Sequence, residues 1–225
     1  VLFRSQDGTE AWRVLPEAKR RQIAEAAVDE FAACGYSRAS MNAVVKAAGI
    51  SKGSLFHYFR TKGDLFAGIV DAAFGQVKAR VKAVRDDTAG QPLDARLERL
   101  LETGFQFVSD HPRLASIYFR VLRSGDAPFG RQRVEELGQL SRRFLAELIV
   151  DAQARGETNP DLDPERTAWL LDAMMERLLA AWHAGHLAGD LPPDRVESER
   201  RAWIAAFGAL LAGGLQTPTR ETRRG

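Results

Sequence analysis

Small polar and basic side chains gather in the segment 51–57, where Ser51, Lys52, Ser54 and His57 surround a glycine, Gly53. Lysine and histidine can donate hydrogen bonds to base edges or to phosphates, and hydroxyl groups can donate or accept them. Glycine lets the backbone come close to a second molecule, because it carries no side chain. These residue types in one short segment indicate contact with the groove of a nucleic acid.

Two short helices joined by a glycine turn are expected to position these side chains. Ser40 is a suitable N-cap for a helix over 41–48, and Gly49 can end that helix in the left-handed conformation. Ser51 then caps the second helix. We therefore predict a helix-turn-helix motif over 40–59, whose second helix presents its N-terminal residues to the major groove.

Apolar residues on both sides of the turn predict a small core. Leu55, Phe56 and Phe59 lie at i, i+1 and i+4 of the second helix and are expected to pack inward together. The preceding helix has apolar residues every four positions, at Ile23, Ala27 and Phe31. Three helices are thus expected to close a core between about Pro16 and Phe59.

Charge favours the same interpretation. The segment 13–62 has nine basic and four acidic side chains, a net charge of +5, whereas the whole chain carries only +2. Positive charge concentrated on one small domain is typical of nucleic-acid binding. The alternative is a helical hairpin with a solvated basic face and no DNA partner.

At this point the chain resembles the N-terminal domain of the tetracycline-repressor (TetR) family of bacterial transcription regulators. The resemblance covers about a quarter of the chain and is carried by Ile23, Ala27, Phe31, Gly35 and Tyr36, by 48–55 (AGISKGSL), by His57, Tyr58 and Phe59, and by 59–65 (FRTKGDL). The chain departs from the family pattern at Val45, Phe56 and Gly63, and the phenyl ring at 56 lacks a hydroxyl that tyrosine would supply.

The resemblance implies an all-helical homodimer with an effector pocket in its C-terminal part, and a phosphate contact by Lys62. The predicted DNA-binding residues are Ser40, Met41, Ser51, Lys52, Gly53, Ser54, His57, Tyr58 and Lys62. The expected partners are a double-stranded DNA operator, a second copy of the chain and a small apolar or aromatic effector. No cofactor is expected.

The fold class predicted is all-α, with a three-helix DNA-binding domain over 13–62 and a larger helical effector-binding and dimerisation domain over 63–215. We expect flexible tails over 1–12 and 216–225. Further helices are predicted over 64–86, 93–110, 113–123, 129–155, 164–188 and 194–215.

Apolar stripes on the last two helices predict the dimer interface. The candidate interface residues are Leu170, Met174, Leu178, Trp203, Phe207, Leu210 and Leu211. Alternatively, both stripes pack only within one subunit. The candidate pocket residues are Phe105, Tyr118, Phe144, Met175 and Trp182. Residues of these types at helical spacing are more often ordinary core residues.

Signals for other classes of protein are weak. His183 and His186 at i and i+3 could bind zinc, but surface or capping roles are favoured, and no metal site is predicted. The chain contains none of the common catalytic motifs, so no catalytic residue and no enzyme activity are expected. A single cysteine, Cys34, and the lack of a long apolar run predict a cytoplasmic protein without a membrane span.

The sequence therefore predicts a DNA-binding transcriptional regulator, and most simply a repressor released from a palindromic operator by a small molecule. The alternative is a helical ligand-binding or scaffold protein that does not bind DNA. Steep loss of DNA affinity with rising salt would distinguish the two.

Overall fold

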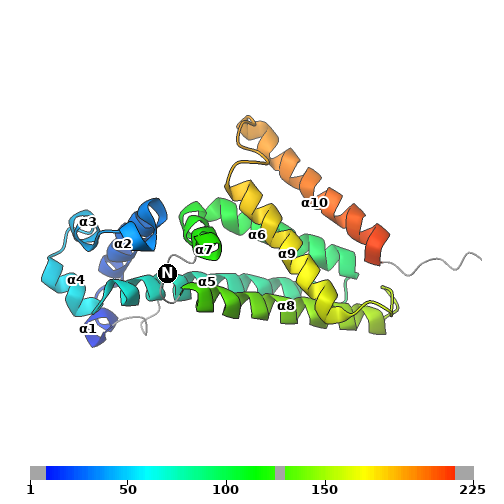
Figure 1. Cartoon of the computed structure of the whole chain (residues 1–225), viewed down its shortest axis with the longest axis horizontal. Helices are drawn as coiled ribbons and strands as arrows, with labels where there is room; N and C mark the ends of the chain where they lie inside the picture. Colours follow the sequence, from blue (N-terminus) through cyan, green and yellow to red (C-terminus); the bar gives the residue numbers. More distant parts are fainter. Residues whose placement is uncertain (1–8, 125–129, 216–225) are drawn as a thin grey trace, which may run out of the picture. The chain divides into compact units, whose positions relative to one another are not determined.

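A computed structural model describes residues 9–124 and 130–215 of the protein. Within these residues all regular structure is α-helical, as the predicted all-α fold class requires (Figure 1). The helices are α1 Glu10–Arg13, α2 Glu17–Arg38, α3 Met41–Ala47, α4 Lys52–Tyr58, α5 Lys62–Asp87, α6 Leu93–Asp110, α7 Pro112–Ser124, α8 Gly130–Ala154, α9 Pro164–His183 and α10 Pro193–Leu215. None of these helices is both long enough and apolar enough to cross a bilayer.

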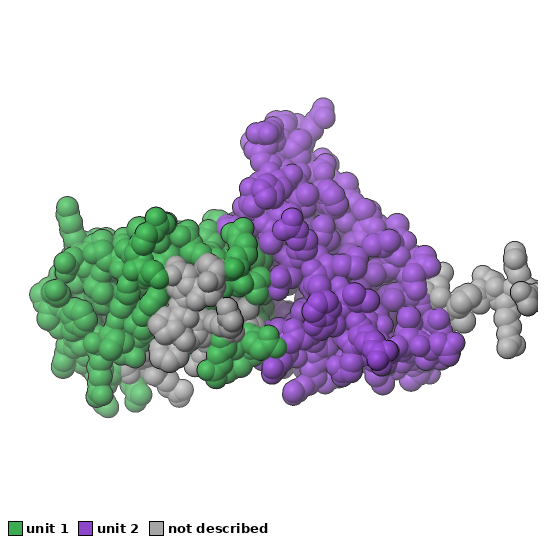
Figure 2. Space-filling view, in the orientation of Figure 1, with its two compact units in different colours: residues 1–79, 110–137 green, residues 80–109, 138–225 purple. Residues whose placement is uncertain are grey.

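The chain forms two compact units, which Figure 2 shows in different colours. The first contains residues 1–79 and 110–137, and the second contains residues 80–109 and 138–225. The division falls inside α5 and inside α8. Helices α1 to α4 and α7 therefore belong to the first unit, whereas α9 and α10 belong to the second.

The core of the first unit is built on the stripe predicted for α2. Ile23, Ala27 and Phe31 are fully buried, together with Leu55 and Phe59 from the motif. Val44 of α3 is buried in the same cluster, so α2, α3 and α4 all contribute to this core and the predicted three-helix core is confirmed.

Helix α7 extends this core by packing against α2. Arg113 forms an ion pair with Asp29, and the Arg120 guanidinium donates a 3.0 Å hydrogen bond to the carbonyl oxygen of Ala32. The first unit therefore includes a helix that follows the motif by about fifty residues in the chain.

Gly35 interrupts α2. Its φ of 74° and ψ of 170° lie in a region that is essentially restricted to glycine. One further helical turn continues to Arg38. The ring of Tyr36 stacks on that of Phe31, with centroids 6.3 Å apart. It also makes an edge-to-face contact with the ring of Phe66, with centroids 5.2 Å apart. The chain after Gly35 therefore returns to the core.

The second unit has its own core between α6, α8, α9 and α10. Leu97, Leu101 and Phe105 of α6 are fully buried there, and Ile149 of α8 is nearly so. The end of α10 is held by the α8–α9 connection, because the Thr158 hydroxyl donates a 2.5 Å hydrogen bond to the carbonyl oxygen of Leu215. This unit therefore packs as a helical bundle in its own right.

Two expectations about element ends were wrong. Helix α9 ends at His183 and not near 188, because the chain turns at Gly185, whose φ is +75°. The tail expected over 1–12 is helical from Glu10, and Trp12 is fully buried. Some expectations lie outside the described residues. These are the part of the first tail over 1–8, the tail over 216–225, and position 129, where the helix expected over 129–155 was to begin.

Candidate nucleic-acid interface

The helix-turn-helix motif is fixed by two serine caps and one glycine. The Ser40 hydroxyl accepts a 3.3 Å hydrogen bond from the backbone N–H of Ala43, and the Ser51 hydroxyl accepts one of 3.0 Å from Ser54. Between them Gly49 adopts a φ of +56°. These contacts satisfy donors that the first turn of each helix would otherwise leave without partners. The predicted caps and turn are thereby confirmed.

Two buried side chains anchor α4 and decide which side of it faces outward. Leu55 and Phe59 are almost completely buried in the core of the first unit. Lys52, Gly53 and His57 are exposed. Small and basic groups therefore cover the outer side of α4, as the sequence predicts for a helix that enters a groove.

Phe56 does not pack inward with Leu55 and Phe59, and that prediction was wrong. Its side chain is 37% exposed. Helical geometry explains the difference, because neighbouring residues on a helix differ by roughly 100° in direction. Leu55 points into the core, so Phe56 is turned away from it.

The remaining predicted residues of the motif differ in their exposure. Ser40 is exposed, and its backbone N–H donates a 2.7 Å hydrogen bond to the Glu30 carboxylate. Met41 and Tyr58 are half-buried, and both pack against the core of the first unit. Ser54 is also half-buried, with its hydroxyl 2.8 Å from that of Ser51.

Lys62 has partners inside the domain. Its ammonium group donates 3.2 Å hydrogen bonds to the carbonyl oxygens of Ser37 and Ala39, and lies 4.8 Å from the centre of the Tyr36 ring. The lysine therefore holds the connection between α2 and α3. Two of its three N–H groups are thus already engaged. The phosphate contact implied for Lys62 stays a prediction.

A capping box at the start of α5 was missed from the sequence. The Asp64 backbone N–H donates to the Thr61 hydroxyl at 3.0 Å, and the Thr61 N–H donates to the Asp64 carboxylate at 2.9 Å. The T-x-x-D spacing at 61–64 is the signal that could have found it.

The segment before α2 braces α4, and this too was missed. The hydroxyl of Thr9 donates a 2.7 Å hydrogen bond to the carbonyl oxygen of His57, and its N–H donates one of 3.1 Å to that of Tyr58. Trp12 packs on Phe59, with ring centroids 4.8 Å apart. These hydrogen bonds give partners to two carbonyl groups at the C-terminal end of α4, and together with the ring contact they help to hold the direction of the helix. A tryptophan beside a predicted core was the available signal.

Four of the five predicted pocket residues lie in the second unit. Phe105 meets the edge of Trp182 with ring centroids 5.1 Å apart, and Phe144 and Met175 pack against the same core. Tyr118 lies in the first unit, where its ring makes an edge-to-face contact with the ring of Phe119, with centroids 5.1 Å apart. The lining of an effector pocket by these residues stays a prediction.

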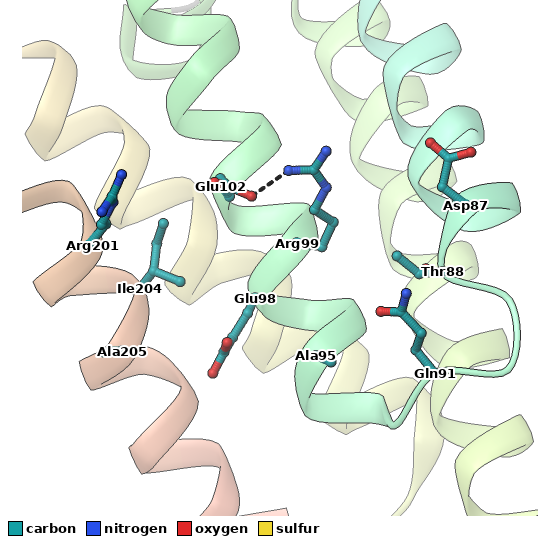
Figure 3. Close-up of a pocket in the computed structure, with 10 residues that line it drawn as sticks. All are labelled: Asp87, Thr88, Gln91, Ala95, Glu98, Arg99, Glu102, Arg201, Ile204 and Ala205. Atoms are coloured by element: carbon teal, nitrogen blue, oxygen red, sulfur yellow. Dashed lines mark hydrogen bonds and ion pairs between the residues drawn. The ribbon is translucent and has the colours of Figure 1, made fainter. Parts of the chain in front are cut away.

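A shallow cavity of about 610 Å³ lies elsewhere in the second unit (Figure 3). Polar and charged side chains from the end of α5, from α6 and from α10 line most of it. Among them, Arg99 and Glu102 form an ion pair, with 2.5 Å between Nη1 of the arginine and Oε2 of the glutamate. Its lining consists of Asp87, Thr88, Gln91, Ala95, Glu98, Arg99, Glu102, Arg201, Ile204 and Ala205. None of the predicted pocket residues is among them.

A polar cluster joins α8 to α9 in the second unit. The Ser141 hydroxyl donates a 2.6 Å hydrogen bond to the Asp172 carboxylate, which also lies 3.6 Å from the Arg142 guanidinium. Burial and, secondly, the nearby charge of Asp172 raise the pKa of Glu176, and Arg142 opposes this effect. Glu176 is therefore a half-buried carboxylate that is costly to ionise.

The predicted dimer residues fall into two groups. Leu170 and Leu210 are 59% and 61% exposed, and so is the neighbouring Trp169 at 58%. Phe207 and Leu211 are buried in the core of their own subunit, so they do not belong to an uncovered stripe. Met174, Leu178 and Trp203 are half-buried against that core.

The zinc alternative at His183 and His186 finds no support. His186 lies beyond the end of α9, so the two side chains do not share a helix face. In the described part of the chain, no three His, Cys, Asp or Glu side chains are grouped closely enough to hold a metal ion.

Known proteins resemble both the motif and most of the length of the chain. Residues 23–69 match the family described as bacterial regulatory proteins, tetR family. The transcriptional regulator AcuR of Cereibacter sphaeroides is 27% identical over 87% of this chain and 89% of its own length.

Solved structures of bacterial transcriptional regulators also resemble the chain. A TetR family transcriptional regulator from Chloroflexus aurantiacus has a TM-score of 0.72 and 26% identity, covering 93% of this chain and 99% of its own. The regulator FadR from Bacillus subtilis, in complex with stearoyl-CoA, has a TM-score of 0.68 and 19% identity, covering 86% and 98%. The latter likeness concerns the fold.

Proposed function

We propose that the chain, whose residues 23–69 match the tetR family of bacterial regulatory proteins, regulates transcription by placing α4 in the major groove of an operator. The observation that carries this proposal is the outer side of α4. Lys52, Gly53 and His57 are exposed there, while Leu55 and Phe59 fix the helix to the core. A helix held in this way can present a constant set of groups to base edges.

Each residue has a role that follows from its chemistry. Lys52 and His57 donate hydrogen bonds to bases or phosphates, and Gly53 lets the backbone approach the groove. Ser40, exposed at the start of α3, and Tyr58, half-buried at the end of α4, are proposed to contact the DNA backbone. These contacts set the register of the protein on the duplex, and base contacts provide the specificity.

A second copy of the chain would complete the regulator. Leu170 on α9 and Leu210 on α10 expose large apolar side chains, which a partner helix could cover. Small residues such as Ala209 and Gly213 on α10 are also exposed and would allow close approach. A two-fold dimer reads an inverted repeat, with half-sites separated by about one helical turn or a multiple of it.

A small molecule would control DNA binding from the second unit. The aromatic and methionine residues Phe105, Phe144, Met175 and Trp182 offer an adaptable apolar lining. FadR, with which the chain shares its fold, binds an acyl thioester with a long apolar chain. An apolar effector is therefore proposed here, with repression relieved when it binds. By linkage, such an effector must bind less tightly to the DNA-bound form.

Selection of bound sequences from a random duplex library, at two salt concentrations, tests this function. The purified full chain should enrich an inverted repeat, and its affinity should fall steeply with salt. Lys52→Ala and His57→Ala should alter or abolish the enriched sequence. Lys78→Ala removes the same charge from an exposed position on α5 and is the matched control. A folded protein that enriches no sequence would contradict the proposal and favour a helical scaffold.

A further inference from the structure

Phe56 lies in the middle of the exposed side of α4. With roughly 100° between successive residues, its direction falls between those of Lys52 and Gly53. Both of these neighbours are exposed, and Phe56 itself is 37% exposed. An apolar ring thus occupies the centre of a surface whose other members are polar or small.

The chemistry of a phenyl ring limits what it can contact in DNA. It has no hydrogen-bond donor or acceptor, so it cannot bind a phosphate or the polar atoms of a base edge. The only apolar group that the base pairs present in the major groove is the C5-methyl group of thymine. Burial of this methyl group against the ring would remove apolar surface of both partners from water.

We propose that Phe56 packs against a thymine C5-methyl group in each operator half-site and thereby specifies a T·A pair. The inference rests on the proposed function, because it requires α4 to lie in the major groove. It adds a specificity contact that needs no hydrogen bond, beside the polar contacts of Lys52 and His57.

Replacement of thymine by uracil provides a direct test, because it removes only the methyl group. Each thymine of the selected operator is replaced in turn, symmetrically in both half-sites, and the Kd is measured by fluorescence anisotropy for the wild type and for Phe56→Ala. One position should weaken wild-type binding by about 4-fold for each half-site, the effect of roughly one buried methyl group. Phe56→Ala should bind the thymine and uracil duplexes equally at that position. Phe56→Leu, which keeps an apolar side chain, should retain part of the preference.

Several results would overturn the inference. These are wild-type affinities that do not change at any uracil position, an operator without thymine in its half-sites, or a thymine preference that Phe56→Ala keeps in full. Because Phe56 is not one of the buried core residues, Phe56→Ala should remain folded, and a thermal melt checks this. Failure to select any operator would instead refute the proposed function itself, so the two failures can be told apart.

Discussion

Replacement of Lys62 by methionine should destabilise the first unit, although the family resemblance implies a phosphate contact for this lysine. The ammonium group donates to the carbonyl oxygens of Ser37 and Ala39, each at 3.2 Å. A hydrogen bond from a charged group contributes about 1.5–3 kcal/mol when its partner is buried. The carbonyl of Ser37 can be rehydrated, because Ser37 is exposed, so we expect a loss of about 2 kcal/mol for the pair.

Urea denaturation of the full chain, followed by circular dichroism, measures this loss. Lys78→Met is the matched control, because it removes one charge from an exposed position of α5 and should change the free energy of unfolding by less than about 0.5 kcal/mol. A loss below about 0.5 kcal/mol for Lys62→Met would refute the structural role of the lysine.

Operator binding by the same variant separates the structural role from a phosphate contact. The slope of log Kd against log salt concentration falls by about one when a single phosphate contact is lost. We expect this change for Lys52→Ala. An unchanged slope for Lys62→Met would leave the lysine with its structural role alone. A fall of about one for Lys62→Met would show that the lysine binds a phosphate, as the family resemblance implies.

Four further substitutions test other parts of the account. Gly53→Ala should raise the stability of the chain by up to about 1 kcal/mol, since only the Ser51 hydroxyl lies near the added methyl group, at 3.8 Å, yet it should weaken operator binding in an anisotropy titration. Gly35→Ala should cost about 1–3 kcal/mol in urea denaturation, because alanine is strained at a φ of 74°. Trp12→Ala should cost about 3–5 kcal/mol, and a loss under about 1 kcal/mol would contradict its place in the core. Glu176→Gln should raise the Tm at pH 7, because burial raises the pKa of the carboxyl group; the gain should shrink as the pH falls through that raised pKa towards 4.5, and a gain independent of pH would refute this cause.

The motif was predictable because its signals are local. Ser40, Gly49 and Ser51 act on backbone groups within three residues of themselves, so their types and spacing contain the necessary information. The stripe on α2 was equally readable, because helical periodicity alone selects the buried side. The family resemblance rests on these same residues.

Features that depend on packing between distant segments were not predictable. Phe56 and Leu55 are both large and apolar, and only the direction of α4 against the core decides which is buried. Trp12 meets residues more than forty positions further along the chain, so no local pattern reveals the contact. The apolar stripe on α10 likewise does not reveal that Phe207 faces its own subunit while Leu210 is exposed.

Amide hydrogen exchange of the full chain, with and without the selected operator, tests the central claim most directly. Because α4 is proposed to lie in the groove, bound DNA should slow exchange in the motif, and most of all over 51–58. Retention of the duplex with unchanged exchange over 51–58 would contradict the account, since the DNA would then be held by another surface.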